Sequence, residues 1–278
     1  MAEQVMPKTI TANGAEFSYV EKGTGGPVIF VHGSLGDYRV WMRQVMTFSE
    51  KYQAISYSRR YHYPNPWTGT GTDYTVSLHA DDLIALIEAL DVGPVNVVGN
   101  SFGAYTTLVA ATRRPDLLRK LVIGEPPILP WLKTQSAGKP YYDAFMRTTW
   151  EPVTRAFQKG DLEQGVRLFI NGVSGQHGVF DHLPAQARQL MLDNALSLSA
   201  ETASPGYFTE ITPQQVEQIP VPMLFLRGQN SSKMFHLVVD QLIQAAPNAQ
   251  NATIPDASHS MPSNNPPVYN QVVIEFLG

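Results

Sequence analysis

The sequence predicts an α/β fold: a mostly parallel sheet flanked by helices, with an inserted helical cap. Short apolar runs alternate with amphipathic helical runs over 28–123 and again over 221–278. Strands that are apolar throughout, and that alternate with helices, are typical of a parallel sheet covered on both faces. The region 126–219 carries helical patterns and no convincing strand. We therefore expect a core domain from 1–125 and 220–278, with 126–219 as its helical cap.

Composition narrows the classes of protein that the chain can belong to. Its 278 residues are 43% hydrophobic and 16% charged, which suits one large domain with a substantial core. The net charge of -4 gives no reason to expect nucleic acid as a partner, and the absence of cysteine excludes disulfides. We see no signal peptide and no apolar run long enough to span a membrane, so we expect a cytoplasmic protein with no membrane partner. A homodimer is compatible with this sequence.

The first half of the chain predicts a hairpin followed by alternating strands and helices. Residues 8–22 give two strands around an Asn-Gly turn, a dipeptide that favours tight hairpins. The run at 75–90 places Leu83, Ile87 and other apolar side chains at helical spacing. The other expected elements are strands at 28–31, 53–57 and 95–98 and helices at 38–50 and 103–113.

The second half predicts the remaining strands, interrupted by helices only. A strand at 120–123 precedes the proposed cap, which is expected to be helical around 139–158, 161–171 and 184–199. Aromatic side chains in this region, such as Trp131, indicate a packed structure and not a linker. The expected elements after the cap are strands at 221–227 and 249–254 and helices at 233–245 and from about 266.

The strongest functional signal is Gly99-Asn100-Ser101-Phe102-Gly103. It follows an apolar strand and opens a helix, as expected of a nucleophile elbow, a sharp turn that presents a serine above the sheet. Side chains at Gly99 or Gly103 would collide with the neighbouring strand or helix. A glycine-rich turn with an incidental serine is the alternative, but the flanking elements favour Ser101 as the nucleophile.

A second signal is His32-Gly33 at the end of an apolar strand. A backbone N–H just after this pair, best that of Ser34, could join the N–H of Phe102 to form an oxyanion hole. We interpret His32 as a structural histidine that hydrogen-bonds this loop, in preference to a catalytic base.

A third signal is His259, which lies in a loop after the last predicted strand. Its position after Ser101 in the chain suits a general base that takes the serine proton and returns it to the leaving group. Alternatively, His259 is a solvated loop histidine without a catalytic role.

The carboxylate that would orient His259 is less evident. Glu125 follows the strand after the elbow helix, at the carboxyl edge of the sheet, where active sites of open α/β folds gather. It could instead be a surface carboxylate at a strand end. Asp256 is the rival, but it lies only three residues before His259 and is better suited to shape that loop.

These motifs, in this order, make the chain resemble the α/β-hydrolase superfamily over nearly its whole length. The resemblance implies a catalytic triad with an Asp shortly after the strand at 221–227, where this chain has Ser231 instead. The arrangement with Glu125 is similar to that of zearalenone-type lactonases and some haloalkane dehalogenases. Dehalogenases and epoxide hydrolases use an Asp nucleophile, so Ser101 argues against both activities.

The resemblance implies a serine hydrolase that cleaves a small-molecule ester or lactone and needs no metal or organic cofactor. The bulky loop at 58–65 replaces a shorter glycine-rich loop of relatives and is expected to line one wall of the pocket. Other chemistry on this fold (carbon–carbon bond hydrolysis, a lyase or a perhydrolase) and a non-catalytic ligand-binding relative remain as alternatives. The candidate pocket residues are His32, Gly33, Arg59, His62 and Trp131.

Overall fold

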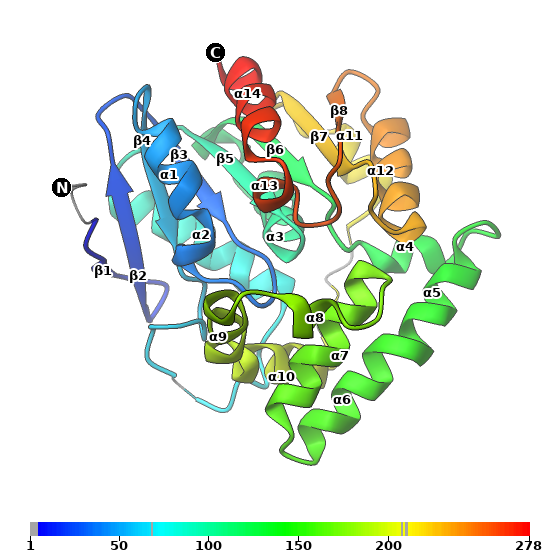
Figure 1. Cartoon of the computed structure of the whole chain (residues 1–278). Helices are drawn as coiled ribbons and strands as arrows, with labels where there is room; N and C mark the ends of the chain where they lie inside the picture. The colour runs from blue at the N-terminus through cyan, green and yellow to red at the C-terminus, as the bar shows by residue number, and fades with distance from the viewer. Residues whose placement is uncertain (1–4, 68, 207, 209–210) are drawn as a thin grey trace.

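The computed structural model describes residues 5–67, 69–206, 208 and 211–278 (Figure 1). The predicted core includes 1–4 and 68, and the predicted cap includes 207 and 209–210; these positions lie outside the described residues. No described helix is long and apolar enough to cross a membrane.

One eight-stranded sheet organises the chain, in the order β1-β2-β4-β3-β5-β6-β7-β8. The first two strands form the predicted hairpin, and both turn residues, Asn13 and Gly14, have the positive φ angles that such a turn requires (42° and 69°). Pairing is antiparallel from β1 to β2 and from β2 to β4, and parallel everywhere else, which confirms the mostly parallel sheet. The strands are β1 (Lys8–Ala12), β2 (Ala15–Lys22), β3 (Gly26–Val31), β4 (Tyr52–Tyr57), β5 (Val95–Asn100), β6 (Leu118–Gly124), β7 (Met223–Gly228) and β8 (Gln250–Ile254).

Helices cover both faces of this sheet, because successive side chains of the buried strands point to opposite sides. On β3, Ile29 packs in a cluster with α2, α3 and α12, whereas Phe30 packs in a second cluster with α1, α13 and α14. The predicted flanking helices are therefore confirmed. They are η1 (Tyr38–Trp41), α1 (Met42–Phe48), α2 (Val76–Leu90), α3 (Phe102–Arg113), α12 (Lys233–Ala245) and α14 (Pro266–Leu277). Two short helices that were not expected, η2 (Pro115–Leu117) and α13 (Met261–Asn264), accompany them.

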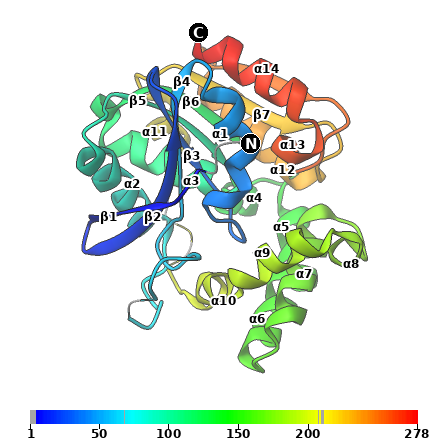
Figure 2. The same cartoon turned by 60° about the vertical axis from the view of Figure 1, so that its left-hand side comes forward.

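The described chain between β6 and β7 forms helices, and α5 to α10 lie together beyond one end of the sheet layers in both views (Figures 1 and 2). These inserted helices have their own apolar cluster, which includes Phe157, Val166 and Leu198. One further member, Leu35, comes from the loop after β3. The inserted helices are α4 (Leu129–Lys133), α5 (Lys139–Phe145), η3 (Met146–Trp150), α6 (Glu151–Gln158), α7 (Leu162–Ser174), α8 (Val179–His182), α9 (Ala185–Asp193), α10 (Ala195–Ala203) and α11 (Pro213–Glu217).

One expected helix is not regular. The segment predicted as continuous at 139–158 passes through a π-helical turn, η3, just before Pro152. Proline has no N–H to donate, and its ring displaces the carbonyl four residues earlier, here that of Thr148. The turn that precedes the proline widens as a result.

Candidate active site

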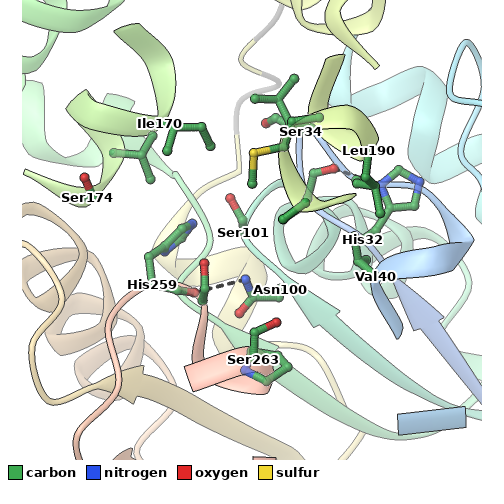
Figure 3. Close-up of a pocket in the computed structure, with 18 of the residues that line it drawn as sticks. His32, Ser34, Val40, Asn100, Ser101, Ile170, Ser174, Leu190, His259 and Ser263 are labelled. Atoms are coloured by element: carbon green, nitrogen blue, oxygen red, sulfur yellow. Dashed lines mark hydrogen bonds between the residues drawn. The ribbon is translucent and has the colours of Figure 1, made fainter. Parts of the chain in front are cut away.

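Ser101 lies on a strained turn between β5 and α3. Its backbone angles are φ 55° and ψ -128°, and its N–H donates to the carbonyl of Gly124 on the adjacent strand, at 2.8 Å. A Cβ on Gly103 would lie 2.1 Å from the carbonyl oxygen of Val31, and one on Gly99 would lie 2.7 Å from that of Gly103. Larger residues at either position would push α3 away from the sheet. The turn directs the Ser101 hydroxyl into a cavity (Figure 3).

His259 faces the same cavity and contacts a carboxylate on its other side. Its Nδ1 lies 2.6 Å from Oε2 of Glu125, and the other carboxylate oxygen accepts a 2.8 Å hydrogen bond from the N–H of Gly228. The Glu125 side chain is fully buried. Because an ionised carboxylate only accepts, Nδ1 of His259 carries the proton and Nε2 is left as the basic nitrogen.

Two further contacts hold His259, and neither was predicted from the sequence. The ring of Phe235 stacks on the imidazole with centroids 4.0 Å apart and an interplanar angle of 13°. The side-chain amide of Asn100 donates to the His259 carbonyl at 3.3 Å, a contact drawn in Figure 3. The ring is therefore restrained in plane and in position.

Neither Asp256 nor Ser231, the other two positions considered for the acid, makes such a contact with His259 among the described residues. Asp256 is exposed, has a positive φ of 53°, and shapes its loop through an N–H bond to the side chain of Gln229. Ser231, at the position where the resemblance implied an Asp, has a buried hydroxyl that finds no partner within the described part of the chain. Of the carboxylates weighed from the sequence, Glu125 is the one that contacts His259. Its catalytic role stays a prediction.

The loop after β3 lies against the serine. A Cβ on Gly33 would be 3.1 Å from the Cβ of Ser101 and 3.6 Å from its hydroxyl oxygen. The carbonyl of Gly33 accepts from Nδ1 of His32 at 2.8 Å and from the guanidinium of Arg59 at 3.1 Å. Since a trans peptide is planar, the N–H of Ser34 must point away from these two donors. The hydrogen bonds to the Gly33 carbonyl therefore fix the direction of the Ser34 N–H, the predicted oxyanion donor. The direction of the Phe102 N–H stays a prediction.

The pocket candidates divide into two groups. His32 and Gly33 line the cavity, but Arg59, His62 and Trp131 do not. Arg59 and His62 are fully buried beneath the loop after β3, and the indole N–H of Trp131 donates to the carbonyl of Ile211. The expectation that these three residues would meet substrate overlooked tertiary contacts that occupy their polar groups.

The cavity has a volume of about 370 Å³. Ser34, Ser101 and His259 line it, together with an apolar wall that comes from α7, α8, α9 and the residue that follows α8. The described residues that line it include no Asp, Glu, Lys or Arg. The apolar members of this wall are Phe169, Ile170, Val173, Val179, Leu183, Ala187, Leu190 and Met191.

Glu125→Gln is expected to lower kcat by about three to four orders of magnitude, since an amide can present its NH₂ to the imidazole and favour the wrong tautomer. Hydrolysis of a p-nitrophenyl ester measures the loss, and thermal unfolding checks the fold. Asp256→Asn is the matched control, because asparagine tolerates a positive φ, and should retain its activity. An equal loss in both variants would refute the role of Glu125.

Three histidines beneath the site make stability depend on pH. Burial, followed by the charge of Arg59, lowers the pKa of His32, His62 and His79 well below the ordinary value of 6.5. Below pH 6.5 the unfolded chain therefore binds protons that the folded chain does not. Each histidine can then remove up to about 1.4 kcal/mol of stability per unit fall in pH.

His79→Phe is expected to flatten this dependence by up to one proton between pH 6.5 and 5. Both ring nitrogens of His79 are buried without a hydrogen-bond partner among the described residues, so phenylalanine loses no bond. Urea unfolding at a series of pH values measures the slope. Replacement of the exposed His177 by Gln should leave the slope unchanged, and an unchanged slope in His79→Phe would contradict the argument.

Comparison with known proteins identifies the family. The chain matches the model of the α/β hydrolase family over residues 28–272. It is 23% identical to a 2-(acetamidomethylene)succinate hydrolase of Mesorhizobium japonicum over 272 residues, covering 92% of this chain and 90% of that protein.

Two solved structures are similar at lower identity. A bromoperoxidase from Bacillus anthracis has a TM-score of 0.79 at 21% identity, covering 98% of this chain and 99% of the other. The carboxylesterase CesB from Bacillus subtilis has a TM-score of 0.77 at 15% identity, covering 99% and 92%. With the family match spanning most of its length and its fold shared by these structures, this chain belongs to the α/β hydrolase family.

Proposed function

We propose that this protein is a serine hydrolase that cleaves a small, uncharged carboxylic ester or lactone through an acyl-enzyme on Ser101. One observation carries the proposal: Ser101 and His259 line a single cavity with an apolar wall, and the buried Glu125 contacts the imidazole of His259. A serine nucleophile needs a base within reach, and the base needs a group that fixes its tautomer.

In the first half of the reaction, the Ser101 hydroxyl attacks the substrate carbonyl carbon while Nε2 of His259 takes its proton. The carbonyl electrons move to oxygen, and the N–H groups of Ser34 and Phe102 bind the oxyanion. One such donor lowers the barrier by about 3–4 kcal/mol. The tetrahedral intermediate then collapses, the bond to the leaving oxygen breaks, and His259 returns the proton to it.

In the second half, water attacks the acyl-enzyme and gives its proton to His259. Collapse of the second tetrahedral intermediate releases the acid and restores the Ser101 hydroxyl. In both halves the imidazole is briefly positive, and the buried Glu125 carboxylate stabilises that charge.

The lining of the cavity supports an uncharged substrate. No Lys or Arg lines it in the described part of the chain, so a substrate carboxylate would be buried without a cation. The M. japonicum relative is named for a substituted succinate, a dicarboxylate. We infer that this chain binds a different class of substrate at the corresponding place.

The region 126–219 is proposed to act as the cap of this site. Side chains of α7, α8 and α9 supply the apolar wall, whereas the nucleophile and its partners come from the ends of sheet strands. In such an arrangement the chemistry depends on the sheet and the choice of substrate on the inserted helices.

Ser101→Ala is expected to abolish hydrolysis of p-nitrophenyl butyrate, because no other hydroxyl lies on the elbow. A fluorophosphonate probe should label the native protein at Ser101 and leave the variant unlabelled, as peptide mass spectrometry would show. Full activity in Ser101→Ala would refute the proposed mechanism. Failure of the native protein to label would favour a ligand-binding relative instead.

Neutral acyl groups should be preferred over anionic ones. We expect kcat/KM for p-nitrophenyl butyrate to exceed that for the monoanionic p-nitrophenyl hemisuccinate by about 30- to 150-fold, equivalent to about 2–3 kcal/mol for an unpaired buried charge. Ala187→Arg, on the partly exposed wall, should narrow this ratio by supplying a cation. A native protein that prefers the hemisuccinate would contradict the uncharged substrate class.

A further inference from the structure

We propose that Glu201, on the inserted helix α10, is a positioning residue for the oxyanion hole, and that it acts through the side chain of Ser34. This inference rests on the proposed function, since it concerns the same N–H donor. It assigns a role in the reaction rate to a residue that lies outside the substrate cavity.

The first support is a buried hydrogen bond between the core and the inserted helices. The Ser34 hydroxyl donates to Oε1 of Glu201 at 2.8 Å, and both side chains are buried. The other carboxylate oxygen lies 3.4 Å from the Tyr74 hydroxyl, which also accepts from Arg59 at 3.1 Å. A hydrogen bond between buried side chains is electrostatically stronger than its counterpart in solvent, because the interior has a lower dielectric constant.

The second support is that the loop after β3 contacts the inserted helices along its length. Leu35 is a member of their apolar cluster. Asp37 accepts from the Asn194 amide at 2.7 Å, and Arg39, in η1 just after the loop, pairs with Asp193 at 2.8 Å. The loop is therefore packed between the sheet and the inserted helices, and Ser34 is the contact nearest to Ser101.

These contacts hold the Gly33–Ser34 peptide from two sides. From the core, His32 and Arg59 bind the carbonyl of Gly33. From the inserted helices, Glu201 binds the hydroxyl of Ser34. When either set of contacts is removed, the peptide can rotate about its flanking bonds. The Ser34 N–H then points less accurately at the oxyanion. The charge on that oxygen develops in the transition state, so the loss should appear in kcat and leave KM nearly unchanged.

The test is a double-mutant cycle of Ser34→Ala and Glu201→Leu, assayed for hydrolysis of p-nitrophenyl butyrate. Each single variant should lower kcat about tenfold, less than the 10²- to 10³-fold typical for complete loss of a donor, with KM within about twofold. The double variant should also lose about tenfold and not a hundredfold, because both changes break one interaction. The rate of fluorophosphonate labelling of Ser101 should fall in parallel.

Two further variants separate positioning from stability. Glu201→Gln keeps an oxygen that can accept from Ser34, so it should retain most of kcat. Ser197→Ala removes another buried hydroxyl of α10, which donates to the carbonyl of Tyr61. It should lower the melting temperature and leave both kcat and KM unchanged. Ser34→Ala keeps the test open if Glu201→Leu fails to fold, since it removes the same bond while the Glu201 carboxyl keeps its contact with the Tyr74 hydroxyl.

The outcomes distinguish this proposal from the one that it rests on. If Ser101→Ala abolishes activity but Ser34→Ala keeps its full kcat, the serine mechanism stands and Glu201 has no positioning role. Additive losses in the double variant, or a loss in Glu201→Gln as large as in Glu201→Leu, would also overturn the inference. If Ser101→Ala is fully active, both proposals fail together.

Discussion

The contact between Glu125 and His259 is the interaction on which the rest of the site depends. The carboxylate is buried, and its two oxygens accept from different segments: the N–H of Gly228 at the end of β7, and the imidazole in the loop after β8. Glu125 itself follows β6 and has a positive φ of 44°. One side chain thus joins three neighbouring strand ends. A buried carboxylate left without these donors would be strongly unfavourable, so the energetics of folding and the geometry of the base are set by the same bonds.

The parallel sheet explains why these groups meet at all. Parallel strands carry all their carboxyl ends at one edge, which brings Ser101 after β5, Glu125 after β6 and the loop after β3 together although they are far apart in sequence. The close packing of α3 on β3 at Gly103 then fixes the distance between the nucleophile turn and the loop that carries Ser34.

How well the sequence predicted each feature depends on how local its cause is. The strands, the hairpin turn at Asn13-Gly14 and the strand–turn–helix around Ser101 follow from short patterns, and the structure agrees with them. The proximity of Glu125 to His259 could be expected from the edge of a parallel sheet. The positions of Arg59 and His62 could not, because arginine or histidine in a surface loop and beneath one look alike in sequence. Nor could the Ser34–Glu201 bond, whose partners are separated by 167 positions.

The inserted helices therefore contribute more than an apolar wall. Their cluster takes in Leu35 from the sheet domain, and their polar side chains bind the segment that carries the predicted oxyanion donor. No described residue of α10 lines the cavity, so a change on α10 that moves Glu201 would disturb the hold on Ser34 without reshaping the wall that meets the substrate. Residues of α9 such as Leu190, which line the cavity but do not bind the loop after β3, can be substituted without disturbing Ser34. Substrate range and rate therefore depend on different inserted helices, because α9 lines the cavity whereas α10 carries Glu201, which binds the hydroxyl of Ser34.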